Sequence, residues 1–581
     1  MKRLSIKIVS CILFLSYLIT SGQGTLKEYQ KAIAIDSIFK NKVINTPSEF
    51  HWISNNSLWY VNNTKNGTEY FLVDAERKIQ KSLFDFDKLI QILSEKINEN
   101  IDAKNIKVDN FNDSELKFTH KKSTYIYNLN DYTLTLFNTS KDDTTKDYGY
   151  WGDFFDESAN PPITAPDSSA IAYIKDYNLY IKNNSTKTET QLSYDGTKGN
   201  YYSSYIKWSP DAKKIMAYKV RPGEENKIYF VESSPKDQFQ PKLQSRDYLK
   251  PGDELPFKSP QLFIVESKKH IKIPTTEFNN QYDISNIKWK KNSKAFTFEY
   301  NQRGHQAYKV IEVNAETGKI NILINETSNT FIDYSSKKYK YDIEGDNEII
   351  WTSERDGWNH IYLYNGDGTL KKQLTKGEWV VRKVIDVDEK NKEIYFTASG
   401  LDKNQDPYFI HYCKIGFDGK NFKRFTSENG NHKVTFSKDY SYYVDQFSRV
   451  DMPAITLLKS ANNAKTLLEL QKGDNSVLLK EGWIAPEVFT AKGRDGETDI
   501  WGIIVRPTTF DPNKSYPIIE YIYAGPHDSF VPKDFHSYYW SMSSLAELGF
   551  IVVQIDGMGT SNRSKAFHDI CWKNLKDAGF P

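Results

Sequence analysis

The amino-acid sequence predicts a mainly β protein, in which an eight-bladed β-propeller is followed by the beginning of a doubly wound α/β domain. Three observations lead to this fold class. Short runs of alternating hydrophobic residues recur from about residue 50 to 470, aromatic residues make up 14% of the chain, and the pattern changes after about residue 485. Aromatic residues favour strands, and a repeat of roughly 40–50 residues with several strands per unit is typical of propeller blades.

The repeat is visible in landmark residues at a nearly constant spacing. Trp351, Phe396 and Tyr443 lie 45 and 47 residues apart. We count eight candidate blades, the fourth of which combines "IKWSPDAKKIMAYKV" with "KIYFVE" and carries a long insertion around "SRDYLKPGDELPFKSP". In its "WSPD" turn, Pro210 fixes φ and Asp211 can bond to its own backbone, so the chain reverses tightly there. The alternative is a two-sheet sandwich or several small β domains.

The pattern after about residue 485 predicts alternating strands and helices. "EVFTAKGRDGETDIWGIIVRP" predicts a hairpin, and "YPIIEYIYAG" and "FIVVQIDGMGTS" predict strands buried on both faces. Between the two strands, Met542 and Ala546 have helical spacing and Gly549 is placed to cap the helix. "HDICWKNLKDAG" predicts the start of another helix. Ligands of such domains bind beyond the carboxyl ends of the strands, which here carry "YAGP" and "DGMG".

The first 22 residues have the three-part layout of a secretory signal. Basic residues precede an apolar run from Ile8 to Ile19, and small residues follow. The run is short for a membrane span, so we expect a periplasmic or secreted protein without one; the alternative is a buried N-terminal strand or helix. The net charge of +2, with no long basic block, argues against nucleic acid as a partner. Beyond the signal, Cys413 and Cys571 show no metal-ligand spacing.

Taken in order, the motifs of this chain resemble a family. The β repeats, the "GRDG" hairpin, "YPIIEYIYAGP" and "DGMG" closely resemble the prolyl oligopeptidase family of serine peptidases, in particular its dipeptidyl peptidase IV branch, and so do "SERDGWNHIYLY" and "YVDQFSRVDMPAITLL". The resemblance implies a propeller over an α/β-hydrolase domain, a Ser-Asp-His triad that cleaves short peptides, and a homodimer. The expected domains are a signal peptide (1–22), an N-terminal segment (23–49), the propeller (50–484) and the truncated beginning of the hydrolase domain (485–581).

The same resemblance assigns a role to the tyrosine of the "YAGP" motif, which is Tyr523. In the family this tyrosine helps to form the oxyanion hole. A phenol at the end of a strand can direct its proton at the oxygen of a tetrahedral intermediate, and the glycine and proline that follow allow a sharp turn. The alternative is that Tyr523 only packs where the two domains meet.

The other catalytic groups are not found in this chain. No G-x-S-x-G elbow is present, and Ser561 in "GTSNR" lacks the closing glycine, so we expect it to be a loop serine. The pairs His527-Asp528 and His568-Asp569 precede any elbow, whereas the acid and base follow it in hydrolases of this fold, and we expect both pairs to be solvated. Nucleophile, acid and base are therefore predicted to be absent, and the chain as it stands to be inactive.

The sequence leaves the substrate specificity open. Dipeptidyl peptidases hold the substrate amine with paired glutamates that lie shortly before a "WSP" motif, but no carboxylate stands between Asp195 and Trp208. A buried amine without a paired anion is costly, so dipeptide release is in doubt. The function predicted is that of an exported serine peptidase cleaving short peptides, and the alternative is a non-enzymatic peptide- or glycan-binding propeller. Without an H-E-x-x-H motif, and with scattered histidines, no metal or cofactor is predicted.

Overall fold

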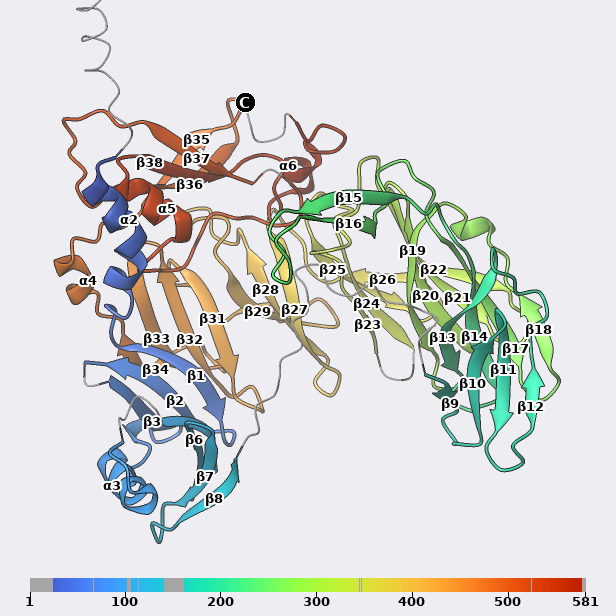
Figure 1. Cartoon of the computed structure of the whole chain (residues 1–581), viewed down its shortest axis with the longest axis horizontal. Coiled ribbons are helices and arrows are strands. Elements are labelled where there is room, and N and C mark those ends of the chain that lie inside the picture. Colours follow the sequence, from blue (N-terminus) through green and yellow to red (C-terminus); the bar gives the residue numbers. More distant parts are fainter. Residues whose placement is uncertain are drawn as a thin grey trace, which may run out of the picture. The chain divides into compact units, whose positions relative to one another are not determined.

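A computed structural model gives the fold of the chain (Figure 1). It describes residues 24–65, 67–101, 106–112, 114–139, 161–343, 345, 347–523 and 525–576. The predicted signal peptide lies outside these residues. The chain forms two compact units. The first unit comprises Met1–Thr145, Gly357–Asn359 and Lys376–Pro581, and the second comprises Lys146–Asp356 and His360–Thr375.

The first unit contains four antiparallel sheets of four strands each, paired in chain order. Their strands are β1 (Thr46–Trp52), β2 (Ser57–Thr64), β3 (Gly67–Asp74) and β4 (Ile79–Ser82); β5 (Ile106–Asn112), β6 (Glu115–His120), β7 (Ser123–Asn128) and β8 (Leu134–Thr139); β27 (Val380–Asp388), β28 (Glu393–Ser399), β29 (His411–Gly416) and β30 (Lys423–Arg424); β31 (Asn431–Phe436), β32 (Tyr442–Arg449), β33 (Met452–Ser460) and β34 (Thr466–Lys472).

The second unit contains four more antiparallel sheets of this kind. Their strands are β9 (Ile163–Thr164), β10 (Ala170–Lys175), β11 (Asn178–Asn183) and β12 (Glu189–Gln191); β13 (Tyr201–Trp208), β14 (Lys214–Arg221), β17 (Phe257–Ile264) and β18 (Lys269–Lys272); β19 (Gln281–Trp289), β20 (Ala295–Gln302), β21 (Ala307–Asn314) and β22 (Ile320–Thr327); β23 (Lys340–Asp342), β24 (Glu348–Ser353), β25 (His360–Asn365) and β26 (Leu370–Gln373). Eight such sheets are the blades that the repeat predicts, and the mainly β fold class is confirmed.

The landmark residues of the repeat occupy equivalent places in their blades. Trp351, Phe396 and Tyr443 all lie on the second strand of a sheet, on β24, β28 and β32. None of the three is more than 1% exposed. The "WSPD" turn also has its predicted structural role, because the Asp211 carboxylate accepts hydrogen bonds from the Ser209 hydroxyl (2.5 Å) and the Lys213 amide (3.1 Å).

The fourth blade differs from the prediction in its third strand. The segment "KIYFVE" forms β15 (Lys227–Glu232), which pairs with β16 (Lys242–Asp247) in a separate two-stranded sheet. The blade is completed by β17, which pairs with β14 along its whole length. Local strand propensity favours β15, because β17 contains Pro260. However, β17 has four consecutive buried residues and β15 is almost entirely exposed. Burial therefore decides which segment joins the blade.

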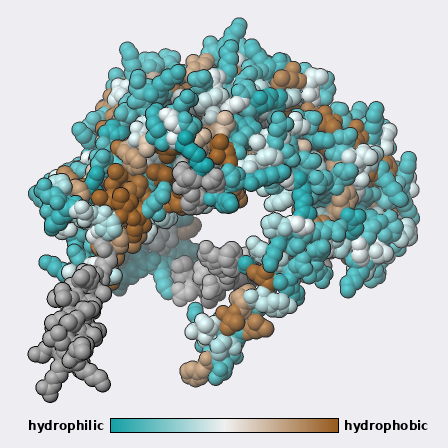
Figure 2. Space-filling view, turned by 90° about the horizontal axis from the view of Figure 1, so that it is seen from above, coloured by the Kyte–Doolittle hydropathy of each residue, from teal (hydrophilic) through white to brown (hydrophobic). Residues whose placement is uncertain are grey.

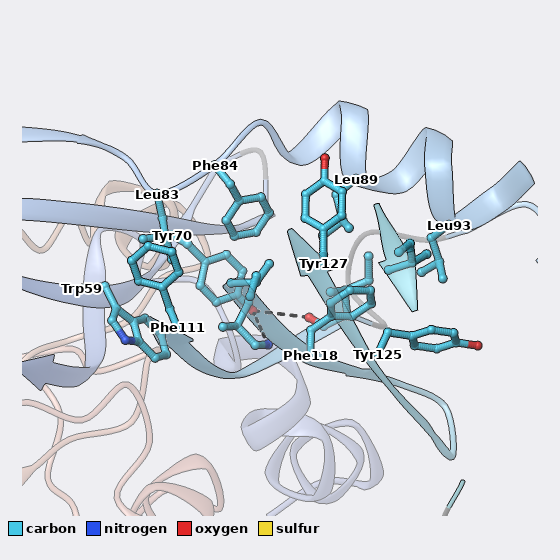
Figure 3. Packing of buried hydrophobic residues seen from close by; sticks show 14 of the residues in the cluster. Trp59, Tyr70, Leu83, Phe84, Leu89, Leu93, Phe111, Phe118, Tyr125 and Tyr127 are labelled. Carbon is cyan, nitrogen blue, oxygen red and sulfur yellow. Dashed lines mark hydrogen bonds between the residues drawn. The ribbon is translucent and has the colours of Figure 1, made fainter. Parts of the chain in front are cut away.

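A helix fills the space beside the first two sheets. Helix α3 (Phe86–Ile97) buries Leu89 and Leu93 against aromatic residues of both sheets (Figure 3). The aromatic residues labelled there are Trp59, Tyr70, Phe84, Phe111, Phe118, Tyr125 and Tyr127. The Tyr70 hydroxyl is hydrogen-bonded between the two sheets, 3.4 Å from the Ile106 carbonyl and 3.3 Å from the Val108 amide. Hydrophobic burial stabilises the cluster, and the hydrogen bonds of this hydroxyl fix the orientation of the Tyr70 ring within it.

The C-terminal part of the chain is a small α/β layer. Its sheet has the order β35-β36-β38-β37, with an antiparallel hairpin of β35 (Glu487–Lys492) and β36 (Asp499–Val505), and with β37 (Ile518–Ile522) parallel to β38 (Ile551–Asp556). The predicted hairpin, and the strands predicted on either side of a helix, are confirmed. The prediction that β37 is buried on both faces is wrong for the described chain, because β37 lies at the sheet edge and Ile518 is 68% exposed.

Two helices follow the pattern of the sequence to different degrees. Helix α5 (Trp540–Glu547) buries Met542 and Ala546, and the Gly549 amide donates to the Ala546 carbonyl, as predicted. The last helix of the described residues is a single turn, α6 (Lys565–Asp569), and residues 570–576 do not continue the helix expected from "HDICWKNLKDAG". Two further short elements are the helix α4 (Ser476–Lys480) and the 3₁₀ turn η3 (Thr276–Phe278).

The N-terminal helix belongs to the α/β layer. Helix α2 (Leu26–Phe39) begins with a capping box formed by Thr25 and Glu28, and it lies beside α5 (Figure 1). Its residues Ile35 and Phe39 share one hydrophobic cluster with α5, β36 and β38. The sequence predicted only a segment leading into the propeller here, so the packing of α2 on the α/β layer is a new finding.

The surface is largely polar, as expected for a chain in which 26% of the residues are charged. The face seen in Figure 2 is mostly hydrophilic, and hydrophobic residues appear on it in separate groups. Within the described ranges, no helix has the length and hydrophobicity needed to cross a membrane.

The packing of α2 can be tested with two isoleucines on one helix. Ile35 is 1% exposed and Ile33 is 83% exposed. We expect Ile35→Ala to lower the free energy of unfolding by about 2–5 kcal/mol, because it removes buried methyl groups and leaves a cavity. The matched control Ile33→Ala should stay within about 0.5 kcal/mol of wild type. Urea unfolding of the two variants measures both values, and equal losses would contradict the packing described.

Candidate active-site loop and the adjoining hollow

Tyr523 lies just beyond the carboxyl end of β37, where α/β sheets bind ligands. Its ring is 41% exposed and packs on Phe530, with 3.8 Å between the ring centroids. A Cβ atom on Gly525 would come within 3.2 Å of the Tyr523 ring. The glycine of the "YAGP" motif therefore leaves room for the tyrosine ring to fold over the backbone that follows it.

A buried carboxylate holds the loop of residues 525–531, which follows Tyr523. Asp556, the last residue of β38, is fully buried and accepts hydrogen bonds from the amides of Phe530 (2.6 Å) and Val531 (3.2 Å). Burial raises the pKa of Asp556, against the opposing effects of Lys533 and of the two amide hydrogen bonds. Sequence reasoning missed this residue, although an aspartate ending an apolar strand before a glycine turn was the available signal.

Asp528 connects this loop to two other segments. Its carboxylate accepts a hydrogen bond from the Asn562 amide (2.6 Å) and lies 3.8 Å from the Arg382 guanidinium. Its backbone carbonyl accepts from the Ser561 amide (3.2 Å). His527 and Asp528 are exposed, as predicted, but Asp528 also ties the loop to the turn after β38 and to the propeller strand β27.

The second His-Asp pair is not solvated as predicted. His568 is fully buried, because the single turn of α6 directs it inward beside Phe567. Asp569 forms an ion pair with Lys565 at 2.9 Å, and it also lies 3.6 Å from the Nε2 atom of His568. Ser561 lies in the turn after β38, as expected for a loop serine, and it is fully buried.

The segment after the loop is docked on the last two propeller sheets. The Lys533 ammonium pairs with the Asp406 carboxylate at 2.7 Å, and both side chains are largely buried. Asp534 accepts a hydrogen bond from the Asn431 amide (2.9 Å), and the Tyr539 hydroxyl donates to the Val450 carbonyl (3.2 Å). These contacts place the α/β layer and sheets β27–β30 and β31–β34 in one packed unit.

A hollow of about 1350 Å³ lies beside this docked segment. Its wall includes strands β1, β27 and β31 and residues 534–537. Arg382 on β27 lines the hollow and also lies close to Asp528. It therefore connects the hollow to the loop that contains Asp528. The sequence did not predict a role for Arg382, because "VVRKV" has the pattern of an ordinary strand whose charged residues face water.

Three possible metal ligands meet inside the blade β31–β34. The ligand atoms of Glu428, His432 and Asp445 lie within 4.8 Å of one another. The Lys459 ammonium pairs with both carboxylates, at 3.0 Å from Asp445. His432 bonds to the Asp445 carboxylate (2.7 Å) and to the Glu428 carbonyl (2.9 Å). The lysine thus supplies the positive charge that a metal ion would bring, and we read the cluster as a buried ion-pair network.

This network predicts an acid-sensitive step in stability. Burial raises the pKa of Glu428, but hydrogen bonds from Lys459 and the Ser427 amide and the charge of Lys459 outweigh it and lower the pKa to about 2. A carboxyl with a lowered folded-state pKa stabilises the fold above its unfolded pKa, and the stabilisation is lost as the pH falls toward its folded pKa. We expect the free energy of unfolding to fall between about pH 4.5 and 2.

Urea titrations across this pH range test the assignment. Glu428→Gln should be less stable than wild type at neutral pH and should lose less stability on acidification. The exposed Glu497→Gln is the matched control and should keep the wild-type acid profile. A Glu428→Gln profile parallel to that of wild type would contradict the role of this carboxylate.

Comparison with known proteins agrees with this architecture. The model of the dipeptidyl peptidase IV (DPP IV) N-terminal region matches residues 100–454, and that of the prolyl oligopeptidase family matches residues 536–581. Dipeptidyl peptidase 4 of Trichophyton equinum is 26% identical over 447 residues, which cover 71% of this chain and 56% of the relative. Dipeptidyl peptidase 4 of Trichophyton rubrum is 27% identical with the same coverage. This chain thus spans little more than half the length of these relatives.

The fold is also found in solved structures. The crystal structure of Porphyromonas gingivalis dipeptidyl peptidase 4 matches with a TM-score of 0.54 and 17% sequence identity, covering 95% of this chain and 76% of that one. At this identity the match concerns the fold alone. The sequence match to the N-terminal region, by contrast, extends over more than half of the chain. The protein therefore belongs to the dipeptidyl peptidase IV branch of the prolyl oligopeptidase family.

Proposed function

We propose that this chain provides the propeller and the first part of the catalytic domain of an exported serine peptidase that cleaves short peptides. The observation that carries the proposal is the placement of Tyr523. Its phenol is partly exposed beyond the carboxyl end of β37, on a loop held by Asp556 and Asn562. A fixed donor at this position suits the stabilisation of an oxyanion during acyl transfer.

The proposal names short peptides and leaves the mode of cleavage open. Asp195, the last carboxylate before the "WSP" motif, already accepts hydrogen bonds from Lys219 (2.6 Å) and from the Tyr202 hydroxyl (2.8 Å). Its negative charge is therefore already balanced by residues of the adjoining blade, and Asp195 is a poor partner for a substrate amine. Release of dipeptides, which the names of the relatives indicate for those proteins, is not part of the proposal.

Export is part of the same proposal, because the first 22 residues have the layout of a secretory signal. Cell fractionation tests it. The protein should be recovered from the periplasm or the medium, and removal of residues 1–22 should leave it in the cytoplasm. Recovery of the intact chain from the cytoplasm would contradict export.

Tyr523→Phe tests the catalytic role in the protein that carries the whole catalytic domain. The change removes one hydrogen-bond donor and keeps the ring on Phe530. We expect kcat for a short peptide to fall by about 10²–10³ with little change in KM, because the hydroxyl acts mainly in the transition state. Labelling of a serine by a fluorophosphonate should persist in both proteins. Absence of labelling in the wild type would refute a serine peptidase, and an unchanged kcat would make Tyr523 a packing residue.

A homodimer is the assembly we propose, with the β15–β16 hairpin as its contact. The two strands pair only with each other among the described strands, and Tyr229, Val231 and Leu243 are 62–72% exposed. Exposed apolar side chains gathered on one hairpin mark an interaction site. Light scattering should give a dimer mass for the wild type and a monomer mass for Tyr229→Ser/Leu243→Ser. Leu370→Ser, at another exposed leucine, is the control; a monomeric wild type would refute the assembly.

A further inference from the structure

The hollow beside the docked segment is lined by an excess of positive charge. Its charged lining residues are Lys65, Arg382, Lys383, Lys433 and Asp534. The single carboxylate among them is engaged, because Asp534 accepts hydrogen bonds from the Asn431 amide (2.9 Å) and the Ser448 hydroxyl (3.5 Å). The wall of the hollow therefore presents cations to whatever enters it.

Arg382 is the most buried of these cations, because Lys65, Lys383 and Lys433 are all exposed. Its side chain is 17% exposed, it donates one hydrogen bond to the Ser399 hydroxyl (3.2 Å), and its nearest carboxylate, Asp528, lies 3.8 Å away. Burial lowers the pKa of Arg382, and Asp528, Tyr408 and Asp556 only partly oppose this effect. A guanidinium has five N–H donors in a fork that matches a carboxylate. A carboxylate in the hollow could supply further acceptors for this guanidinium and a negative charge closer than that of Asp528.

The two lysines beside it have no such partner. Lys383 and Lys433 are exposed to the hollow, and neither forms an ion pair with a carboxylate of the residues that the structure describes. They come from β27 and β31, the first strands of two successive blades, and both line the same hollow, so their ammonium groups add to one field. The remaining lining includes neutral polar groups, among them Gln446 and Thr397, that can bond to a peptide backbone.

The size of the hollow fits a peptide better than a single small molecule. Pockets for small ligands usually measure roughly 300–1,000 Å³, and this hollow is larger. Its charge excludes the substrate amine as the group that is recognised there, because like charges repel. The negatively charged groups of a peptide are its C-terminal carboxylate and its acidic side chains, and both present the same chemistry.

We propose that this hollow binds a carboxylate of a short peptide, with Arg382 as the principal ligand and Lys383 and Lys433 as supporting charges. The inference rests on the proposed function only in taking short peptides as ligands. It adds that the acidic end of the peptide, and not its amine, is recognised beside the Tyr523 loop.

Peptide binding to the purified 581-residue chain tests the proposal without requiring catalysis. The probes are tetra-alanine peptides that carry a fluorescent dye on the N-terminal amine and end in either a free acid or an amide. A second pair ends in an amide and has Glu or Gln at the third position. We expect the free acid to bind roughly 10- to 100-fold more tightly than the amide, as measured by fluorescence anisotropy. Tighter binding of the Glu peptide than of the Gln peptide would identify side-chain carboxylates as ligands too.

Substitutions of lining residues test which side chains cause the preference for the free acid. Arg382→Gln should remove the preference for the acid, and Arg382→Lys should restore part of it. Because Arg382 is buried, the double variant Lys383→Gln/Lys433→Gln is a second test at exposed positions, and it should weaken acid binding and its dependence on salt. Lys403→Gln, at a lysine that is 89% exposed and outside the hollow, should change nothing.

The outcomes separate this inference from the proposed function. Equal affinity for acid and amide would overturn the inference while leaving peptides as ligands, and so would an acid preference that survives both Arg382→Gln and the double lysine variant. Absence of binding to every peptide would overturn the inference as well. Fluorophosphonate labelling of the protein with its whole catalytic domain decides the proposed peptidase function independently.

Discussion

The rest of the structure depends on one constraint, which is that blades of the propeller have strands that are hydrophobic on both faces. The second strands make this plain, because all residues of β20 except the last and all residues of β28 except the first are buried. Such a sheet is stable only when neighbours cover both faces. Successive sheets accordingly share clusters, as when Met216 of β14 packs with Phe296 of β20.

The same constraint explains why the α/β layer is docked on the propeller. Its small sheet cannot bury its own helices, and it completes a core with residues that precede it in sequence. Ile35 of α2, Val450 after β32 and Trp483 after α4 share one cluster with Tyr539 and Met542. Polar contacts such as the ion pair of Lys533 with Asp406 then fix the direction of a segment that hydrophobic burial has already brought there. The loop of Tyr523 is thus held through the propeller as much as through its own strand.

The sequence predicted the features that local pattern determines. The period of the blades followed from buried aromatic residues such as Trp351 and Phe396, whose spacing is a property of the chain. The third strand of the fourth blade could not be predicted in this way, because β15 and β17 both have strand-like composition and only pairing with β14 distinguishes them. Helix α2 was missed for a related reason, since its partner α5 lies about 500 residues away in the sequence. Long-range packing, and not propensity, decided both cases.

The candidate site shows the same division between local and long-range information. Tyr523 could be found from its motif, because the residues that place it are its neighbours in sequence, down to the glycine that makes room for its ring. Asp528 and Arg382 could not, because the sequence predicted a solvated residue in one case and an ordinary strand residue in the other. Together they join the loop of Tyr523 to the wall of the hollow across 3.8 Å. Arg382 therefore belongs to both features, and any charge that enters the hollow acts on the same guanidinium that faces the Tyr523 loop.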